Sequence, residues 1–237
     1  MAKRVAMPKR DTFLTDKRIE EEAALLLAEW AQKHGEVNDP PVPIDEIIEL
    51  HLGLTYEIDD LRSRFHHDDV LGAIWFDDAT IRVDQSLDPH VHPRMLGRYR
   101  FTLAHETGHW RMHRDRFRRD DTQSEMFDGE GKPSFICRSS DRPPEEIQAD
   151  KFAGAVLMPR AMVYRVWESW RGDAGPVCVL DLEIPDFDTD PKRNQTIAME
   201  RFCKPLADRF GVSAQAMCIR LETLELLVRE RPNLLFG

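Results

Sequence analysis

The sequence predicts an α+β protein in which a small antiparallel sheet packs against several helices. Three long segments carry apolar residues at helical spacing and are bounded by glycine or proline. Two short apolar runs, Leu71–Phe76 and Thr80–Val83, flank a three-residue connection that is typical of a β-hairpin. The 237 residues are 41% hydrophobic and 32% charged, so the chain can bury a sizeable core.

The first half of the chain alternates helices and strands. Glycines close the first two helices, and prolines precede the last one. In chain order we expect a helix over 19–34, a short amphipathic helix over 44–52, a strand over 54–58, the hairpin, and a helix from about 94 to 113.

The second half begins with a polar segment over 114–144, whose glycines and prolines indicate a long surface loop. A double proline then starts a helix over 145–157, and a further helix follows over 161–170. Residues 172–194 are expected to be irregular, and two helices over 197–210 and 213–229 complete the chain. We therefore divide the chain into a tail (1–18), a main domain (19–170), a connector (171–196) and a C-terminal helical segment resembling a helix-turn-helix (197–237).

Composition disfavours several classes of protein. A formal net charge of -10 is unfavourable for binding nucleic acid, and the basic run Arg111–Arg119 is followed by aspartates, which indicates a solvated loop. No run reaches the roughly 18 apolar residues of a membrane span, and Met1–Asp11 lacks the apolar core of an export signal. The four cysteines are widely spaced and predict no disulfide framework. We expect a cytoplasmic protein that contacts neither membrane nor nucleic acid directly.

One motif indicates metal chemistry. Phe101–Trp110 reads FTLAHETGHW, so His105, Glu106 and His109 form an H-E-x-x-H pattern on an expected helix. Residues four apart share a helical face, so both imidazoles can bind one ion, while Glu106 can reach a bound water as a general base. The competing interpretation is a satisfied histidine pair with a solvent-facing glutamate. Shuffled sequences of this composition contain the pattern roughly 0.03 times, which disfavours that interpretation.

A catalytic zinc usually has three protein ligands, and the helix over 145–157 offers carboxylates at its start. We expect Glu146 to be the third ligand and Glu145 a first-turn residue that stabilises the helix end. Asp150 lies one turn after Glu146 on the same face, where it can accept a hydrogen bond from a ligating histidine. His113 is too far along its helix to bind the same ion, so we assign it to the surroundings of the ligands. Glycine inside a helix is costly, so Gly108 predicts that a neighbouring helix or a substrate approaches the backbone closely there.

Three segments make the chain resemble the ImmA/IrrE family of metallopeptidases. They are RYRFTLAHETGHW from Arg98, EEIQADKFAGAVLMP from Glu145 and LADRFGVSAQAMCIRLETLELL from Leu206. With the hairpin, the resemblance covers roughly Ile44 to Leu227. It implies a zincin-like fold of the gluzincin type, a zinc site made of two histidines and one glutamate, and cleavage of helix-turn-helix transcriptional repressors.

The resulting hypothesis is a zinc metallo-endopeptidase with one Zn²⁺ per chain. His105, His109 and Glu146 hold the metal, Glu106 is the catalytic base, and the substrate is a helix-turn-helix repressor. Tyr164 and Arg138 are weak candidates for stabilising the oxyanion.

Two alternatives stay open. The first is a binding module that releases a repressor by contact alone, with a structural metal. The second is a DNA-binding regulator that uses Phe210–Leu227, although acidic residues outnumber arginines there and a lid or docking element fits better. The stretch Cys137–Ser140 precedes the second motif and could shape or block the cleft. Cys137 is either a free or packed thiol or a zinc ligand in a latent form.

Overall fold

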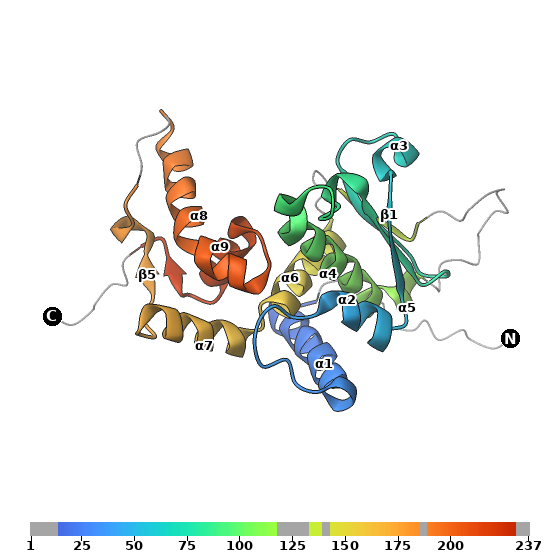
Figure 1. Cartoon of the computed structure of the whole chain (residues 1–237), viewed down its shortest axis with the longest axis horizontal. Helices are drawn as coiled ribbons and strands as arrows, with labels where there is room; N and C mark the ends of the chain where they lie inside the picture. The colour runs from blue at the N-terminus through green and yellow to red at the C-terminus, as the bar shows by residue number, and fades with distance from the viewer. Residues whose placement is uncertain (1–13, 118–132, 139–142, 185–188, 231–237) are drawn as a thin grey trace, which may run out of the picture.

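The computed structural model describes residues 14–117, 133–138, 143–184 and 189–230. Most of the predicted tail, most of the polar segment after Phe117 and residues 139–140 of the cysteine-containing stretch lie outside the described residues. Figure 1 shows helices and a small sheet on one side of the molecule and the C-terminal elements on the other. The predicted α+β class is confirmed.

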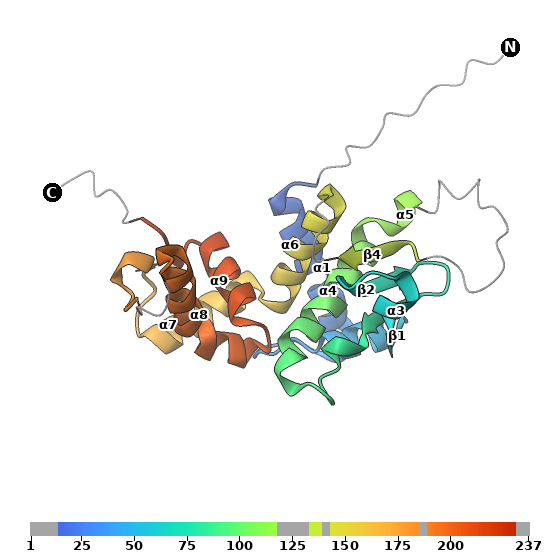
Figure 2. The ribbon, with the colours of Figure 1, turned by 90° about the horizontal axis from the view of Figure 1, so that it is seen from above.

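Three helices form the centre of the main body. Helix α4 (Leu96–Met112) lies between the sheet and α6 (Pro144–Leu157), and α1 (Asp16–His34) packs against α6 (Figure 2). A Cβ on Gly108 would lie 3.2 Å from Cα of Ala149, so this glycine lets α4 approach α6 closely. The close neighbour expected at Gly108 is therefore a packed helix.

The sheet has four strands in the order β1-β3-β2-β4: β1 (Thr55–Asp59), β2 (Val70–Trp75), β3 (Thr80–Asp84) and β4 (Phe135–Arg138). Strands β2 and β3 form the predicted antiparallel hairpin, although four residues connect them instead of three. The expectation of a wholly antiparallel sheet is wrong in one place, because β1 runs parallel to β3. After β1 the chain forms α3 (Leu61–Phe65) and then β2, and it reverses at the hairpin to form β3 between β1 and β2. Because α3 and β2 separate β1 from β3 in the sequence, these two strands can run in the same direction.

Shorter elements connect these parts. The predicted helix over 44–52 consists of α2 (Ile44–Glu46) and a π-helical turn (Ile47–His51). Short 3₁₀ turns occur at Gln85–Leu87 and Pro93–Met95, and α5 (Arg114–Phe117) follows α4. Among the residues that the structure describes, none of the helices combines the length and apolar character needed to cross a bilayer.

The C-terminal elements are α7 (Arg160–Arg171), β5 (Val177–Cys178), a 3₁₀ turn (Val179–Asp181), α8 (Pro191–Phe210), α9 (Ala214–Thr223) and β6 (Leu227–Val228). Helix α8 begins six residues before the predicted start, because Asp190 caps it and Pro191 occupies its first turn. Helix α9 is shorter than predicted, since the chain turns at Glu225 and pairs β6 with β5. The division into main domain, connector and C-terminal segment stays a prediction.

Helix α9 contacts the main body through one buried arginine. The guanidinium of Arg220 donates to the carbonyl of Met158 at 2.9 Å and forms an ion pair with Glu20 of α1. Arg220 is 4% exposed. The C-terminal helices are therefore fixed against α1 and the end of α6, on the side where the candidate site opens.

Candidate metal centre

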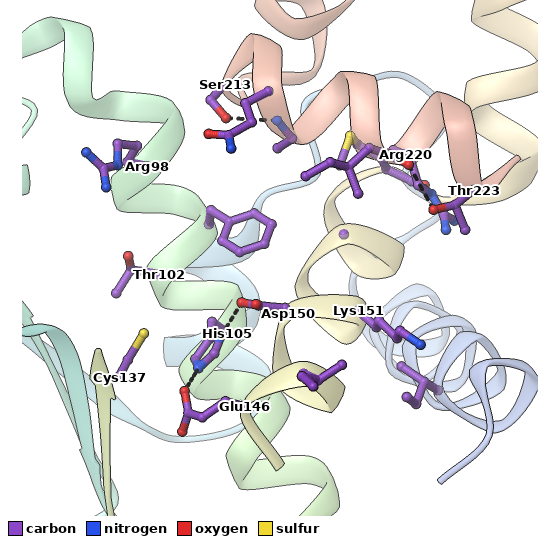
Figure 3. Close-up of a pocket in the computed structure, with 18 of the residues that line it drawn as sticks. Arg98, Thr102, His105, Cys137, Glu146, Asp150, Lys151, Ser213, Arg220 and Thr223 are labelled. Carbon is purple, nitrogen blue, oxygen red and sulfur yellow. Dashed lines mark hydrogen bonds and ion pairs between the residues drawn. The ribbon is translucent and has the colours of Figure 1, made fainter. Parts of the chain in front are cut away.

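The three predicted ligands meet where α4 faces α6. Figure 3 shows two of them, His105 and Glu146, on these helices. Nε2 of His105 lies 3.1 Å from Nε2 of His109 and 3.1 Å from Oε2 of Glu146, and Nε2 of His109 lies 3.2 Å from Oε1 of Glu146. Ligand atoms about 2.0–2.1 Å from a tetrahedral zinc lie about 3.3 Å from one another. The triangle of donor atoms therefore has the size, and the nitrogen and oxygen chemistry, that suits a zinc ion.

Asp150 sets the orientation of His105. Its Oδ1 lies 3.0 Å from Nδ1 of His105. An ionised carboxylate only accepts hydrogen bonds, so Nδ1 of His105 carries the proton and the Nε2 lone pair points toward the other two ligands. Asp150 thus lies where the sequence predicts, one helical turn beyond Glu146.

A second chain of hydrogen bonds orients His109. Oε1 of Gln148 lies 3.2 Å from Nε2 of His113, and Nδ1 of His113 lies 2.9 Å from Nδ1 of His109. Burial lowers the pKa of His113, so its ring is neutral and its unprotonated Nδ1 accepts from His109. This leaves the Nε2 lone pair of His109 free to bind a metal. His113 lies beside the ligands as predicted, but no sequence pattern marks Gln148, whose partner is 35 residues away.

Glu106 is buried beside the ligands. Its side chain is 0% exposed, and neither carboxylate oxygen has a hydrogen-bond partner among the described residues. Burial raises the pKa of Glu106 to about 8, although the Coulombic effect of His105 lowers it in part. A buried carboxylate without a partner is costly, so its retention indicates that a water or metal-bound group completes its environment.

The electrostatics favour a cation at this point. Burial raises the pKa of Glu146, but the adjacent rings of His105 and His109 lower it more, so that the net pKa is about 2. Burial lowers the pKa of His109 to about 3. Burial also lowers the pKa of His105, yet the surrounding Cys137, Asp150 and Glu146 raise it more, so that without a metal a proton is favoured there. An ionised glutamate and a neutral His109 are the states that metal binding requires.

A cavity of about 660 Å³ extends from the metal centre toward α9. His105 and Glu146 line one end, and Ser213, Ala216 and Ile219 of α9 line the other. Figure 3 shows α9 above the ligand-bearing helices. A peptide segment can therefore contact the ligand residues and α9 at the same time.

Two residues of β4 also reach the centre, and the sequence analysis did not predict this strand. The ring of Phe135 stacks on His109 with centroids 4.1 Å apart. Cys137 supplies a donor atom that lies within 4.8 Å of those of His105 and Glu106. Of the candidates for oxyanion stabilisation, Tyr164 is not brought to the cavity, because it donates to the carbonyl of Leu224 at 3.0 Å. The side chain of Arg138 lies outside the described part of the structure.

Comparison with known proteins places the chain in a family. Residues 90–222 match the family model described as "IrrE N-terminal-like domain", Peptidase_M78. No curated protein matches the chain. A solved structure described as a "Mycobacterium tuberculosis transcriptional regulator" is similar with a TM-score of 0.46 and 17% identity, and the match covers 92% of this chain and 50% of that one. The chain thus spans half of that protein's length. Because the family model matches more than half of its residues, the chain belongs to the Peptidase_M78 family.

Proposed function

We propose that the protein is a zinc-dependent metallo-endopeptidase. The observation that carries this proposal is the convergence of His105, His109 and Glu146 beside the buried carboxylate of Glu106, which has no hydrogen-bond partner in the described part of the chain. A zinc ion bound by these three ligands would act as a Lewis acid and would lower the pKa of a water molecule toward about 7. Metallopeptidase activity is the function implied by the family, and the donor set fits zinc better than magnesium or calcium, which prefer oxygen ligands.

The chain's own residues supply the proton transfers. Glu106 follows His105 on α4 and lies beside the ligands, so it can accept a proton from the attacking water as the new C–O bond forms. It can return that proton to the leaving amine as the peptide C–N bond breaks. Asp150 and the Gln148–His113 pair keep the two ligating rings in the required tautomer throughout.

The proposed substrate is a cytoplasmic helix-turn-helix repressor, whose cleavage would relieve repression. This part of the proposal rests on the family resemblance. Direct DNA binding by α9 is disfavoured, because Arg220 is the only basic residue of that helix and is buried in contacts with Glu20 and Met158.

The second candidate is a non-proteolytic anti-repressor with a structural metal. Structural zinc sites are usually closed by four protein ligands and need no catalytic carboxylate. The buried carboxylate of Glu106 costs stability and has no structural partner among the described residues, so it favours catalysis.

The test compares wild type with Glu106→Gln, and uses Glu145→Gln as a control one residue from the ligand. Two probes are used: the helix-turn-helix protein encoded nearest to this one in its genome, and a fluorescence-quenched peptide library. Wild type and Glu145→Gln should cleave and should each bind about one zinc per chain. Glu106→Gln should keep zinc and lose cleavage. Full cleavage by purified Glu106→Gln would overturn the role of Glu106, and regulation of the repressor without cleavage by wild type would support the anti-repressor.

A further inference from the structure

Strand β4 forms one wall of the metal centre. Alternate residues of a strand face the same side, so Phe135 and Cys137 both face α4. The Phe135 ring stacks on the ligand His109, and the Cys137 side chain contacts the ligand His105 by a hydrogen bond. One short strand therefore touches both histidine ligands.

The neighbouring strand leaves room for this arrangement. Gly72 of β2 pairs with Cys137, and the register shifts between Val70 and Gly72. A Cβ on Gly72 would lie 2.8 Å from Oε1 of Glu106, so the carboxylate occupies the place that a side chain would need. Irregularities of this kind re-aim side chains next to active sites. The Cys137 thiol lies beside Glu106 next to this irregularity.

Cys137 and Glu106 thus face the same point. The donor atoms of His105, Glu106 and Cys137 all lie within 4.8 Å of one another, as do those of His105, His109 and Glu146. His105 belongs to both groups, so the thiol lies beside the ligand cluster and next to the carboxylate of Glu106. A thiolate is a strong zinc ligand, whereas three protein ligands leave one tetrahedral position open.

We propose that Cys137 binds the metal as a fourth protein ligand and so holds the peptidase in a latent form. This inference rests on the proposed function. A thiolate in the fourth position excludes the water that Glu106 would activate. Activation then requires the thiol to leave. Strand β4 is at an edge of the sheet among the described strands and pairs only with β2, so its displacement breaks one ladder of hydrogen bonds.

Cobalt substitution tests the proposal independently of activity. Metal-free wild type, Cys137→Ser, Cys137→Ala and Cys178→Ser are loaded with Co²⁺, and absorption is recorded in the near ultraviolet, where thiolate-to-cobalt charge transfer appears. Cys178 is buried in β5 and serves as the matched control. Wild type and Cys178→Ser should show the band, and both Cys137 variants should bind one cobalt without it. Wild type should cleave the quenched peptide library only through the fraction of molecules whose thiol has left the metal, so the Cys137 variants should cleave it faster than wild type.

The two proposals fail in different ways. If wild type binds one cobalt per chain but shows no charge-transfer band, or if the band persists in Cys137→Ser, the role proposed for Cys137 is wrong and the three-ligand site stands. If wild type binds no cobalt, the metal site itself is wrong. Circular dichroism of each variant checks that the fold is intact.

Discussion

Replacing Gly72 with alanine should destabilise the protein and displace the carboxylate of Glu106, the proposed catalytic base. The added Cβ would lie 2.6 Å from Cγ2 of Thr102 and 2.8 Å from Oε1 of Glu106, whereas ordinary van der Waals contact begins near 3.4 Å. Thr102 is buried on α4 and its β-branched side chain is stiff, so it cannot rotate away freely. Either α4 or β2 must therefore move by several tenths of an ångström.

The expected magnitude follows from two opposing effects. Overpacking of a filled core costs about 1–3 kcal/mol, and replacing a strand glycine gains about 0.5–1 kcal/mol by reducing the entropy of the unfolded chain. The free energy of unfolding should thus fall by about 1 kcal/mol, and at most by about 2.5 kcal/mol. Because Glu106 is one of the two groups displaced, cleavage should fall by more than the loss of folded protein explains.

The assay is urea denaturation followed by circular dichroism, together with peptide cleavage at a temperature where each variant is folded. Gly154→Ala is the control, because this glycine is inside α6 and a Cβ there meets nothing within 4 Å. That variant should gain about 1 kcal/mol from helix propensity. A Gly72→Ala protein as stable and as active as wild type would refute the packing argument.

Three further predictions concern other parts of the structure. Asp150→Ala and Gln148→Ala should each weaken zinc affinity by roughly 10–100-fold, measured by chelator competition, because each orients a ligand ring; unchanged affinity would contradict the tautomer assignment. In metal-free protein, burial raises the pKa of Glu106 from 4.5 to about 8, so the stability that this group contributes is present below pH 4.5 and is lost as the pH rises toward 8. Glu106→Gln cannot ionise, so its free energy of unfolding relative to wild type, measured by urea denaturation, should rise between pH 4.5 and 8. A difference that stays constant over this range would show that burial does not raise the pKa of Glu106. Arg220→Ala should lower the free energy of unfolding by about 3 kcal/mol, because it leaves the partly buried Glu20 and the carbonyl of Met158 unpaired. The control Arg229→Ala removes a more exposed ion pair with Glu222 and should lower the free energy of unfolding by less than about 1 kcal/mol. Equal effects of the two substitutions would show that α9 is not anchored through Arg220.

The parts of the fold that the sequence predicts are those set by local patterns. Helices α1, α4 and α6 follow from apolar periodicity and from flanking glycine or proline, and the β2–β3 hairpin follows from two runs joined by a short connection. The approach of Glu146 to the two histidines is consistent with the spacing of the motifs. For the helices and the hairpin, the deciding interactions lie within a few residues of one another or on one helical face, whereas Glu146 and His105 are 41 residues apart and belong to different helices.

The missed elements depend on distant partners. Strand β4 has only four residues in a polar segment, and it forms because β2, more than 60 residues earlier, offers an edge. The parallel β1–β3 pair and the two-residue strands β5 and β6 also depend on long-range pairing. Phe135 and Gln148 were missed as parts of the site for the same reason, since neither belongs to a local motif. Asp190 and Pro191 do carry a local signal for the start of α8, because an aspartate at the N-cap followed by proline is typical of a helix start.

The central claim is that a metal ion is held by His105, His109 and Glu146, and elemental analysis of zinc in matched variants tests it most directly. Purified wild type and Glu145→Ala should contain about one zinc per chain, whereas Glu146→Ala and His105→Ala should contain almost none after dialysis. Glu145 and Glu146 are adjacent, so this pair tests the register of α6 against α4 as well as the presence of the metal. Zinc retained in Glu146→Ala but lost in Glu145→Ala would show that the register is wrong by one residue, and zinc absent from wild type would contradict the metal centre itself.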